Sequence, residues 1–150
     1  MIEMKILGVD SYKDIVAFDK MCFPADYWKE EDWKELLSDN RATYYALMDR
    51  DIIVGDIFTY NWKGENDYLK IMNIAIHPDY RKQGLGYKLM GYAMDEFKAS
   101  GLDRIAAETR ASNVAMQALF KKCGYEFNKA EEDYYSNPSE AGYKYVFTQS

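Results

Sequence analysis

Two glycines, Gly84 and Gly86, flank Leu85 at a point where a strand-like pattern ends and a helical pattern begins. Glycine lets the backbone come close to a ligand, and the free N–H groups at a helix N-terminus bind phosphate through hydrogen bonds and the helix dipole. The preceding Arg81 and Lys82 add positive charge. The loop therefore predicts a pyrophosphate site, and a tight strand-to-helix turn without a ligand is the alternative.

Other ligand patterns do not match the chain. A P-loop needs a Gly-Lys-Ser/Thr sequence, and the dinucleotide fingerprint needs a third glycine where this chain has Leu89. The isolated Cys22 and Cys123 do not have the spacing of zinc ligands, so no metal site is expected. We interpret His77, which precedes Pro78, as a turn residue rather than a catalytic group.

The composition is that of a globular protein, with 48% hydrophobic and 29% charged residues in a chain of 150. This length fits one domain, residues 1–150, with a sizeable core. The net charge of −6 offers no basic face for direct nucleic-acid binding and suits a cationic partner such as a protonated amine. We expect no signal peptide, no membrane segment and, because the cysteines are isolated, a reducing cytoplasmic location.

Hydrophobic periodicity predicts a mixed α/β sheet with helices on both faces. Two strands around the polar turn at 49–51 form a predicted hairpin. In the strand at 68–76, the apolar positions change from odd to even near Met72 and Asn73, which indicates burial on both faces or a β-bulge. We expect strands at 5–9, 43–48, 52–60, 68–76, 104–109, 125–128 and 142–148, helices at 11–22, 30–37, 84–97 and 113–123, and a polar loop that reaches Tyr134 and Tyr135.

Residues 73–86, Asn-Ile-Ala-Ile-His-Pro-Asp-Tyr-Arg-Lys-Gln-Gly-Leu-Gly, resemble the signature of the GNAT N-acetyltransferase superfamily. Residues 108–113, Glu-Thr-Arg-Ala-Ser-Asn, and the later Ala-Leu-Phe and Gly-Tyr at 118–120 and 124–125 are similar to the family's next motif. With its late Tyr-Tyr pair, the chain most resembles bacterial ribosomal-protein-alanine N-acetyltransferases. The resemblance implies a GNAT-like, mostly antiparallel sheet that is splayed at the cofactor strand.

The resemblance also implies acetyl-coenzyme A as co-substrate and places its binding residues. Its pantetheine arm would pair with the strand before the glycine loop, its pyrophosphate with the loop, and its amide arm with Asn113, for which a plain helix cap is the alternative. The implied cofactor-binding residues are Ile74, Ala75, Ile76, Arg81, Lys82, Gln83, Gly84, Leu85, Gly86, Tyr87, Asn113 and Phe120.

The implied reaction is direct attack of a neutral amine on the thioester. An α-amino group has a reference pKa of about 8, against about 10.4 for lysine, so a protein N-terminus needs only modest help from a base. Glu108 matches the family's catalytic glutamate and is expected to take the amine proton directly or through water. A surface or salt-bridged glutamate is the alternative interpretation of this residue.

The chain departs from the family at Phe120, where those enzymes usually carry a tyrosine that protonates the leaving thiolate. Phenylalanine has no proton to give. We expect Tyr134, or else Tyr135, to substitute, unless the thiolate leaves unassisted. Loop packing or a dimer contact is the alternative role for this pair.

These observations predict an N-acetyltransferase whose acceptor is a protein N-terminal α-amino group. Two alternatives stay open: an acetyltransferase for a small-molecule amine, and a module that binds acetyl-coenzyme A with little turnover. We expect a monomer or a homodimer. The aromatic residues Tyr27, Trp28, Trp33, Tyr60 and Trp62 are interpreted as packing residues, with an acceptor groove as the alternative.

Overall fold

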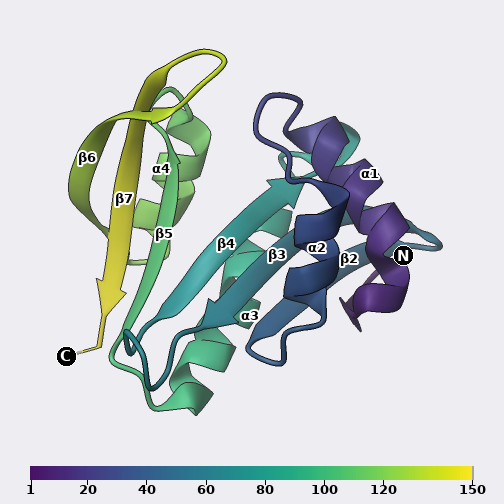
Figure 1. Ribbon diagram of the computed structural model, residues 1–150, viewed down its shortest axis with the longest axis horizontal. Coiled ribbons are helices and arrows are strands. Elements are labelled where there is room, and N and C mark those ends of the chain that lie inside the picture. Colours follow the sequence, from purple (N-terminus) through teal and green to yellow (C-terminus); the bar gives the residue numbers. More distant parts are fainter. Residues whose placement is uncertain (150) are drawn as a thin grey trace.

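The computed structural model describes residues 1–149, which form one seven-stranded sheet in the order β1-β2-β3-β4-β5-β7-β6 (Figure 1). Neighbouring strands are antiparallel except β4 and β5, which are parallel. The expected mixed, mostly antiparallel sheet is therefore confirmed. The strands are β1 (Ile2–Leu7), β2 (Ala42–Asp49), β3 (Ile52–Asn61), β4 (Leu69–Ile76), β5 (Arg104–Arg110), β6 (Glu126–Tyr135) and β7 (Glu140–Thr148).

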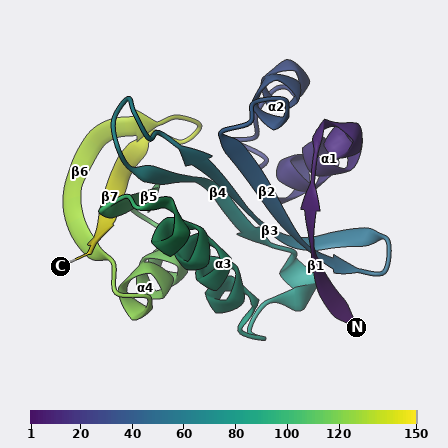
Figure 2. The same ribbon diagram turned by 90° about the horizontal axis from the view of Figure 1, so that it is seen from below.

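Helices cover both faces of the sheet (Figure 2). The helices α1 (Tyr12–Cys22) and α2 (Glu30–Leu37) pack on one face over a core that includes Trp33 and Phe58. The helices α3 (Leu85–Ser100) and α4 (Val114–Lys122) pack on the other face, over a core that includes Leu89 and Phe97. Two short 3₁₀ turns, Val9–Ser11 and Pro78–Tyr80, precede α1 and α3.

The parallel strands β4 and β5 diverge soon after they meet (Figure 1). Among the described residues their ladder contains two pairs, Leu69 with Ile105 and Lys70 with Ala106. Beyond Lys70, no strand within residues 1–149 pairs with the edge of β4 that faces β5. The splay that the resemblance implied at this strand is confirmed, and it separates the sheet into β1-β2-β3-β4 and β5-β7-β6.

A β-bulge explains the change of apolar phase in β4. Phe58 of β3 pairs with Asn73 and Thr59 pairs with Ile71, so Met72 is the extra residue. Asn73 donates to Asp19 of α1 at 3.2 Å, and Met72 packs against the same core, so both side chains point toward α1 and α2. Of the two explanations for the phase change, the bulge is therefore confirmed.

Several predicted boundaries were wrong at the edges of the sheet. The first strand ends at Leu7 rather than residue 9, because a 3₁₀ turn begins at Val9, and Ser11 makes no side-chain cap. The segment up to Tyr135, expected to be a polar loop, belongs to β6. This edge strand is exposed on both faces, so its sequence lacks the apolar alternation that marks a strand.

Candidate active site

The glycine loop connects β4 to the N-terminus of α3. Gly84 has φ 77° and Lys82 has φ 63°, so both residues adopt the left-handed conformation that glycine prefers. In the described part of the chain no side chain caps this helix, and its first turn has no acidic residue. The N–H groups of Leu85, Gly86 and Tyr87 therefore have no acceptor within the helix. This end of α3 can bind an anion.

The side chains around this loop have different roles. Leu85 is buried and contributes to a ligand site only through its backbone. A Cβ at position 86 would lie 3.0 Å from Cδ2 of Leu119, so Gly86 lets α3 approach α4. Tyr87 is exposed, and Nζ of Lys122 lies 4.8 Å from the centre of its ring. Arg81, Lys82 and Gln83 are exposed beside them, so the predicted loop residues are brought together.

The predicted cofactor strand offers its backbone edge to the splay. Ile74 is buried in the core under α3, whereas Ala75 is buried in the core under α1 and α2. Because these side chains point to opposite faces, the N–H and C=O groups lie in the plane of the sheet. The edge toward β5 is unpaired beyond Lys70, so it can pair with an extended amide chain.

Asn113 and Phe120 lie on α4. The side-chain oxygen of Asn113 accepts from the N–H of Met116 at 3.0 Å, so the residue caps the helix and is also exposed. Phe120 is fully buried; its ring stacks on that of Tyr125 with centres 6.0 Å apart, and meets the tilted ring of Tyr145 at 5.4 Å. The cap interpretation of Asn113 is confirmed, and a contact of either residue with the cofactor stays a prediction.

Glu108 lies on β5, two residues past its last pair with β4. Nζ of Lys70, from β4, lies 2.9 Å from its Oε1, so an ion pair crosses from one part of the sheet to the other. The second oxygen, Oε2, is buried and has no hydrogen-bond partner among the described residues.

Tyr134 of β6 reaches over β7 toward the same carboxylate. A Cβ at position 142 would lie 2.5 Å from Cδ2 of Tyr134, so the ring rests on the bare backbone of Gly142. Nζ of Lys144 lies 4.8 Å from the centre of that ring. Burial and the neighbouring Glu108 both raise the pKa of Tyr134, so its hydroxyl stays protonated at neutral pH. The structure thus brings Glu108 and Tyr134 together.

The charge state of Glu108 follows from these neighbours. Burial alone raises the pKa of this carboxyl, but the Tyr134 hydroxyl and the Lys70 ammonium outweigh burial, and the net pKa lies below the usual value. Glu108 is therefore ionised at neutral pH. It is also salt-bridged to Lys70, as the alternative interpretation held.

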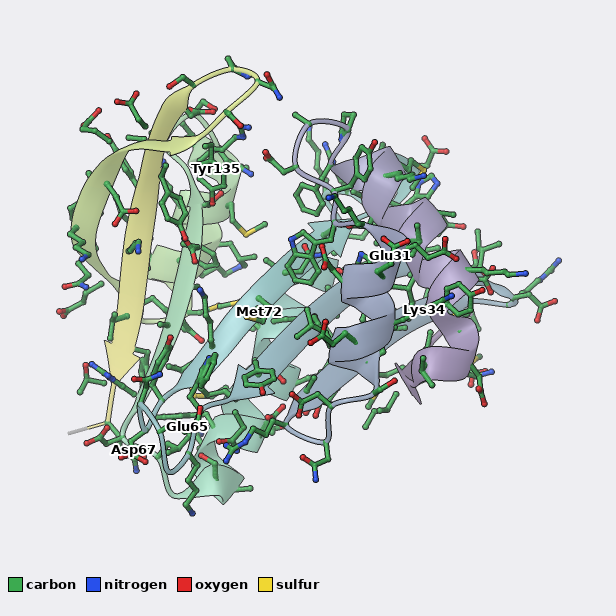
Figure 3. All side chains as sticks on the ribbon, in the orientation of Figure 1. Glu31, Lys34, Glu65, Asp67, Met72 and Tyr135 are labelled. Atoms are coloured by element: carbon green, nitrogen blue, oxygen red, sulfur yellow. The ribbon has the colours of Figure 1, made fainter. Side chains whose placement is uncertain are left out.

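Tyr135 and Met72 lie on opposite sides of the splay (Figure 3). The ring centre of Tyr135 is 4.8 Å from Cζ of Arg110, and its ring meets Tyr134 edge-on at 5.1 Å.

A hollow of about 610 Å³ opens between the α1–α2 loop and the β6–β7 loop. Its lining residues are Pro24, Ala25, Tyr27, Lys29 and Asn137.

Other candidates have structural roles. Nδ1 of His77 accepts from the N–H of Asp79 at 3.0 Å, which confirms a turn residue. Trp33 is buried and its ring centre lies 4.6 Å from that of Trp28, so both pack in the core. Tyr27 differs, because it is exposed and lines the hollow.

Three residues of this site, Lys70, Gly142 and Asp26, were not predicted from the sequence. Lys70 had a signal, because it is a charged residue inside a strand that is otherwise mostly apolar. Gly142 and Asp26 had none, since their importance comes from Tyr134 and Arg110, which only the folded chain brings near them.

Membrane and metal features are limited to two observations. Within residues 1–149, none of the helices combines the length and the apolar character needed to cross a membrane. The same residues contain no cluster of three or more side chains suited to holding a metal ion.

Comparison with known proteins connects this site to an enzyme family. The sequence pattern of the Acetyltransferase (GNAT) family matches residues 11–125. A putative [ribosomal protein bS18]-alanine N-acetyltransferase of Bacillus subtilis is 31% identical over 139 residues, which cover 91% of this chain and 87% of the relative. The [ribosomal protein bS18]-alanine N-acetyltransferase of Escherichia coli K12 is 38% identical over 69 residues, 46% of this chain and 47% of that protein.

Solved structures share the fold. The crystal structure of the ribosomal-protein-S18-alanine N-acetyltransferase from Escherichia coli superposes with a TM-score of 0.87 and 24% identity, covering 100% of this chain and 95% of that one. Arabidopsis thaliana NAA60 in complex with a bisubstrate analogue gives a TM-score of 0.88 at 13% identity, covering 100% and 99% of the two chains.

Proposed function

The chain belongs to the acetyltransferase (GNAT) family and is an N-acetyltransferase, and we propose that it acetylates the α-amino group at a protein N-terminus with acetyl-coenzyme A. One observation carries the proposal. The ionised Glu108, with its buried and unpartnered Oε2, lies where the splay between β4 and β5 begins. The names of the Bacillus subtilis and Escherichia coli relatives support a protein N-terminus as acceptor.

The residues present fit the co-substrate, which supplies an acetyl thioester. We place its pyrophosphate on the free N–H groups of Leu85, Gly86 and Tyr87, with Arg81, Lys82 and Gln83 beside it. The unpaired edge of β4 at Ile74, Ala75 and Ile76 would hydrogen-bond the amide groups of the pantetheine arm. An N–H of that edge would also bind the thioester oxygen, an oxyanion-hole role. Asn113 completes the proposed binding residues, whereas the side chain of Phe120, which the resemblance also implied, has no exposed surface in this structure.

Glu108 is the proposed base. Its Oε2 would accept the proton that the attacking amine loses, directly or through one water. A carboxylate with a lowered pKa is a weak base. It therefore suits an acceptor whose ammonium form has a low pKa and gives up its proton easily. The reference pKa of an α-amino group is about 8, well below the value of about 10.4 for lysine, which favours a chain terminus over a lysine side chain.

Tyr134 is the proposed acid, since Phe120 has no hydroxyl. Its protonated hydroxyl would donate to the departing sulfur, and Glu108 beside it would return the amine proton to the phenolate. The proton lost by the amine thus ends on the thiol, and the enzyme is restored. The cytoplasmic location, the monomeric or dimeric state and the single domain over residues 1–150 stay predictions.

The test is thiol release from acetyl-coenzyme A with a panel of N-terminal peptides and of small amines. Peptides that begin with alanine should be the best acceptors, as judged by kcat/KM. A preference for polyamines, amino acids or antibiotics would contradict the N-terminal assignment. Calorimetric binding of acetyl-coenzyme A without thiol release for any acceptor would favour a binding module.

A further inference from the structure

Two parts of the molecule meet across the splay with few contacts between their strands. The ladder between β4 and β5 joins them at Leu69 and Lys70, near the beginning of β4. Arg110 ends β5 at the opposite, open end of the splay. A contact across this open end would therefore fix the position of the α1–α2 loop relative to β5.

All five N–H groups of the Arg110 guanidinium are engaged. Nε and Nη2 donate to the two carboxylate oxygens of Asp26, at 2.8 and 2.7 Å. Nη1 donates to the backbone oxygen of Pro138 at 2.9 Å and to Glu140 at 3.0 Å. Nη2 also donates to the backbone oxygen of Ser136 at 2.8 Å. Paired, charge-assisted bonds of this kind are strong and fix geometry.

These partners come from both sides of the splay. Asp26 lies in the loop between α1 and α2, 84 residues away in sequence. On the other side, Ser136 and Pro138 belong to the β6–β7 connection, and Glu140 is the first residue of β7. We call the contact between Asp26 and Arg110 the cross-splay bridge. Because the Arg110 side chain is only 16% exposed, solvent screens this bridge less than a surface ion pair.

The hollow between the two loops depends on the same residues. Pro24, Ala25 and Tyr27 flank Asp26, and Asn137 lies between the two residues whose carbonyls accept from Arg110. The N-terminal end of α3, where we place the pyrophosphate, lies on the other face of the sheet, so we place the acceptor on the face of these loops. Glu108 and Arg110 are two residues apart on β5 and therefore share that face.

We propose that Arg110 is a positioning residue that, through the cross-splay bridge to Asp26, fixes the width of the open end of the splay and thereby the binding of the acceptor. This inference rests on the proposed function for its kinetic consequence. The structural part, in which one guanidinium holds the two loops, stands on the five hydrogen bonds alone.

The test uses Asp26→Asn, which weakens the bridge but leaves the contacts of Arg110 with the β6–β7 connection. We expect the KM of an alanine-starting peptide to rise by about tenfold, while the KM of acetyl-coenzyme A changes by less than about twofold. Arg110→Lys keeps the charge but cannot reach both loops. It should therefore also raise the KM of the peptide while leaving the KM of acetyl-coenzyme A nearly unchanged. Hydrogen exchange should become faster in residues 23–29 and 136–140.

Two matched controls separate the bridge from general effects. Glu35→Gln removes one negative charge from an exposed position on α2. Ser139→Ala removes the 2.9 Å hydrogen bond from Ser139, in the β6–β7 connection, to Asp133 of β6, without touching the bridge. Both should keep the wild-type KM for the peptide and the wild-type exchange in residues 23–29.

An Asp26→Asn enzyme with the wild-type peptide KM, or with unchanged exchange in both loops, overturns the proposal. So does an equal rise in the KM of both substrates, which would indicate a general loss of structure. If the wild-type enzyme acetylates no peptide, the proposed function fails, and hydrogen exchange still decides whether the bridge holds the loops.

Discussion

Nζ of Lys70 lies 2.9 Å from Oε1 of Glu108, and this ion pair spans β4 and β5 beside the last residue pair of their ladder. The pair ties the proposed base to the strand along which the pantetheine arm is placed. It also occupies one carboxylate oxygen and leaves the other, Oε2, without a partner among the described residues. Lys70 therefore influences both the position and the ionisation of Glu108.

The first prediction concerns pH. Replacing Lys70 by methionine should move the acidic limb of the kcat/KM profile to higher pH. Lys70 and Tyr134 hold the pKa of Glu108 below its usual value against the effect of burial. Without the Lys70 ammonium, less electrostatic stabilisation offsets the effect of burial on the carboxylate. The pKa of Glu108 therefore rises, and the base becomes protonated at a higher pH. Kinetics over the stable pH range measure the shift.

Two variants serve as controls for this profile. Lys70→Arg keeps a positive charge beside Glu108, so its acidic limb should stay near that of the wild type. Lys5→Met removes an exposed lysine from β1 and should leave the profile unchanged. A Lys70→Met profile that coincides with the wild type would show that the ion pair does not set the pKa of Glu108.

The second prediction distinguishes the two adjacent tyrosines. Tyr134→Phe should lower kcat by about 100-fold, because the proposed proton donor to the sulfur is lost. Tyr135→Phe keeps its ring beside Arg110 and should retain kcat within about threefold. Steady-state thiol release measures both. Equal rates for Tyr134→Phe and the wild type would mean that the thiolate leaves unassisted.

The third prediction concerns Gly142, on which the Tyr134 ring rests. An added methyl group would lie 2.5 Å from Cδ2 of that ring, so Gly142→Ala must displace Tyr134. We expect kcat to fall by about tenfold, because the hydroxyl loses its position beside Glu108. The double variant Gly142→Ala/Tyr134→Phe should be no slower than Tyr134→Phe alone.

Gly91→Ala is the matched control for that substitution. A Cβ at position 91 of α3 meets open space, so kcat should not change. Alanine in a helix interior should also stabilise the protein by about 0.5–1 kcal/mol. If Gly142→Ala behaves like Gly91→Ala, the packing of Tyr134 on β7 does not matter for catalysis.

The fourth prediction concerns the glycine loop. Gly84 has φ 77°, so Gly84→Ala should strain the loop by about 1–2 kcal/mol and move the N–H groups at the start of α3. We expect the Kd of acetyl-coenzyme A, measured by calorimetry, to rise by about tenfold with little change in the KM of the peptide. Gly8→Ala, with φ −112° and open space around it, should bind acetyl-coenzyme A like the wild type.

Local sequence patterns predicted the parts of the fold that local chemistry determines. The helix at 30–37 was placed at its observed bounds, because Trp33 and its apolar neighbours recur at helical spacing. The phase change near Met72 indicated the bulge in β4, since one extra residue reverses the alternation. The exposed edge strand β6 was underestimated because neither of its faces is buried.

The site was predicted in part. The loop at 81–87 and Glu108 were found through the family resemblance, and the structure places them around one splay. The partners of Glu108 and Arg110 were not found, because Lys70 and Asp26 are separated from them by 38 and 84 residues in the chain. Pairings over such distances depend on strand order, which no local pattern encodes.

The most direct test of the account uses a peptide with a free N-terminal alanine and an internal lysine. After incubation with acetyl-coenzyme A, mass spectrometry locates the acetyl group. We predict that it lies on the α-amino group, and that Glu108→Gln lowers kcat/KM by about 100-fold. Acetylation of the lysine instead, or an unchanged rate and pH profile for Glu108→Gln, would contradict the account.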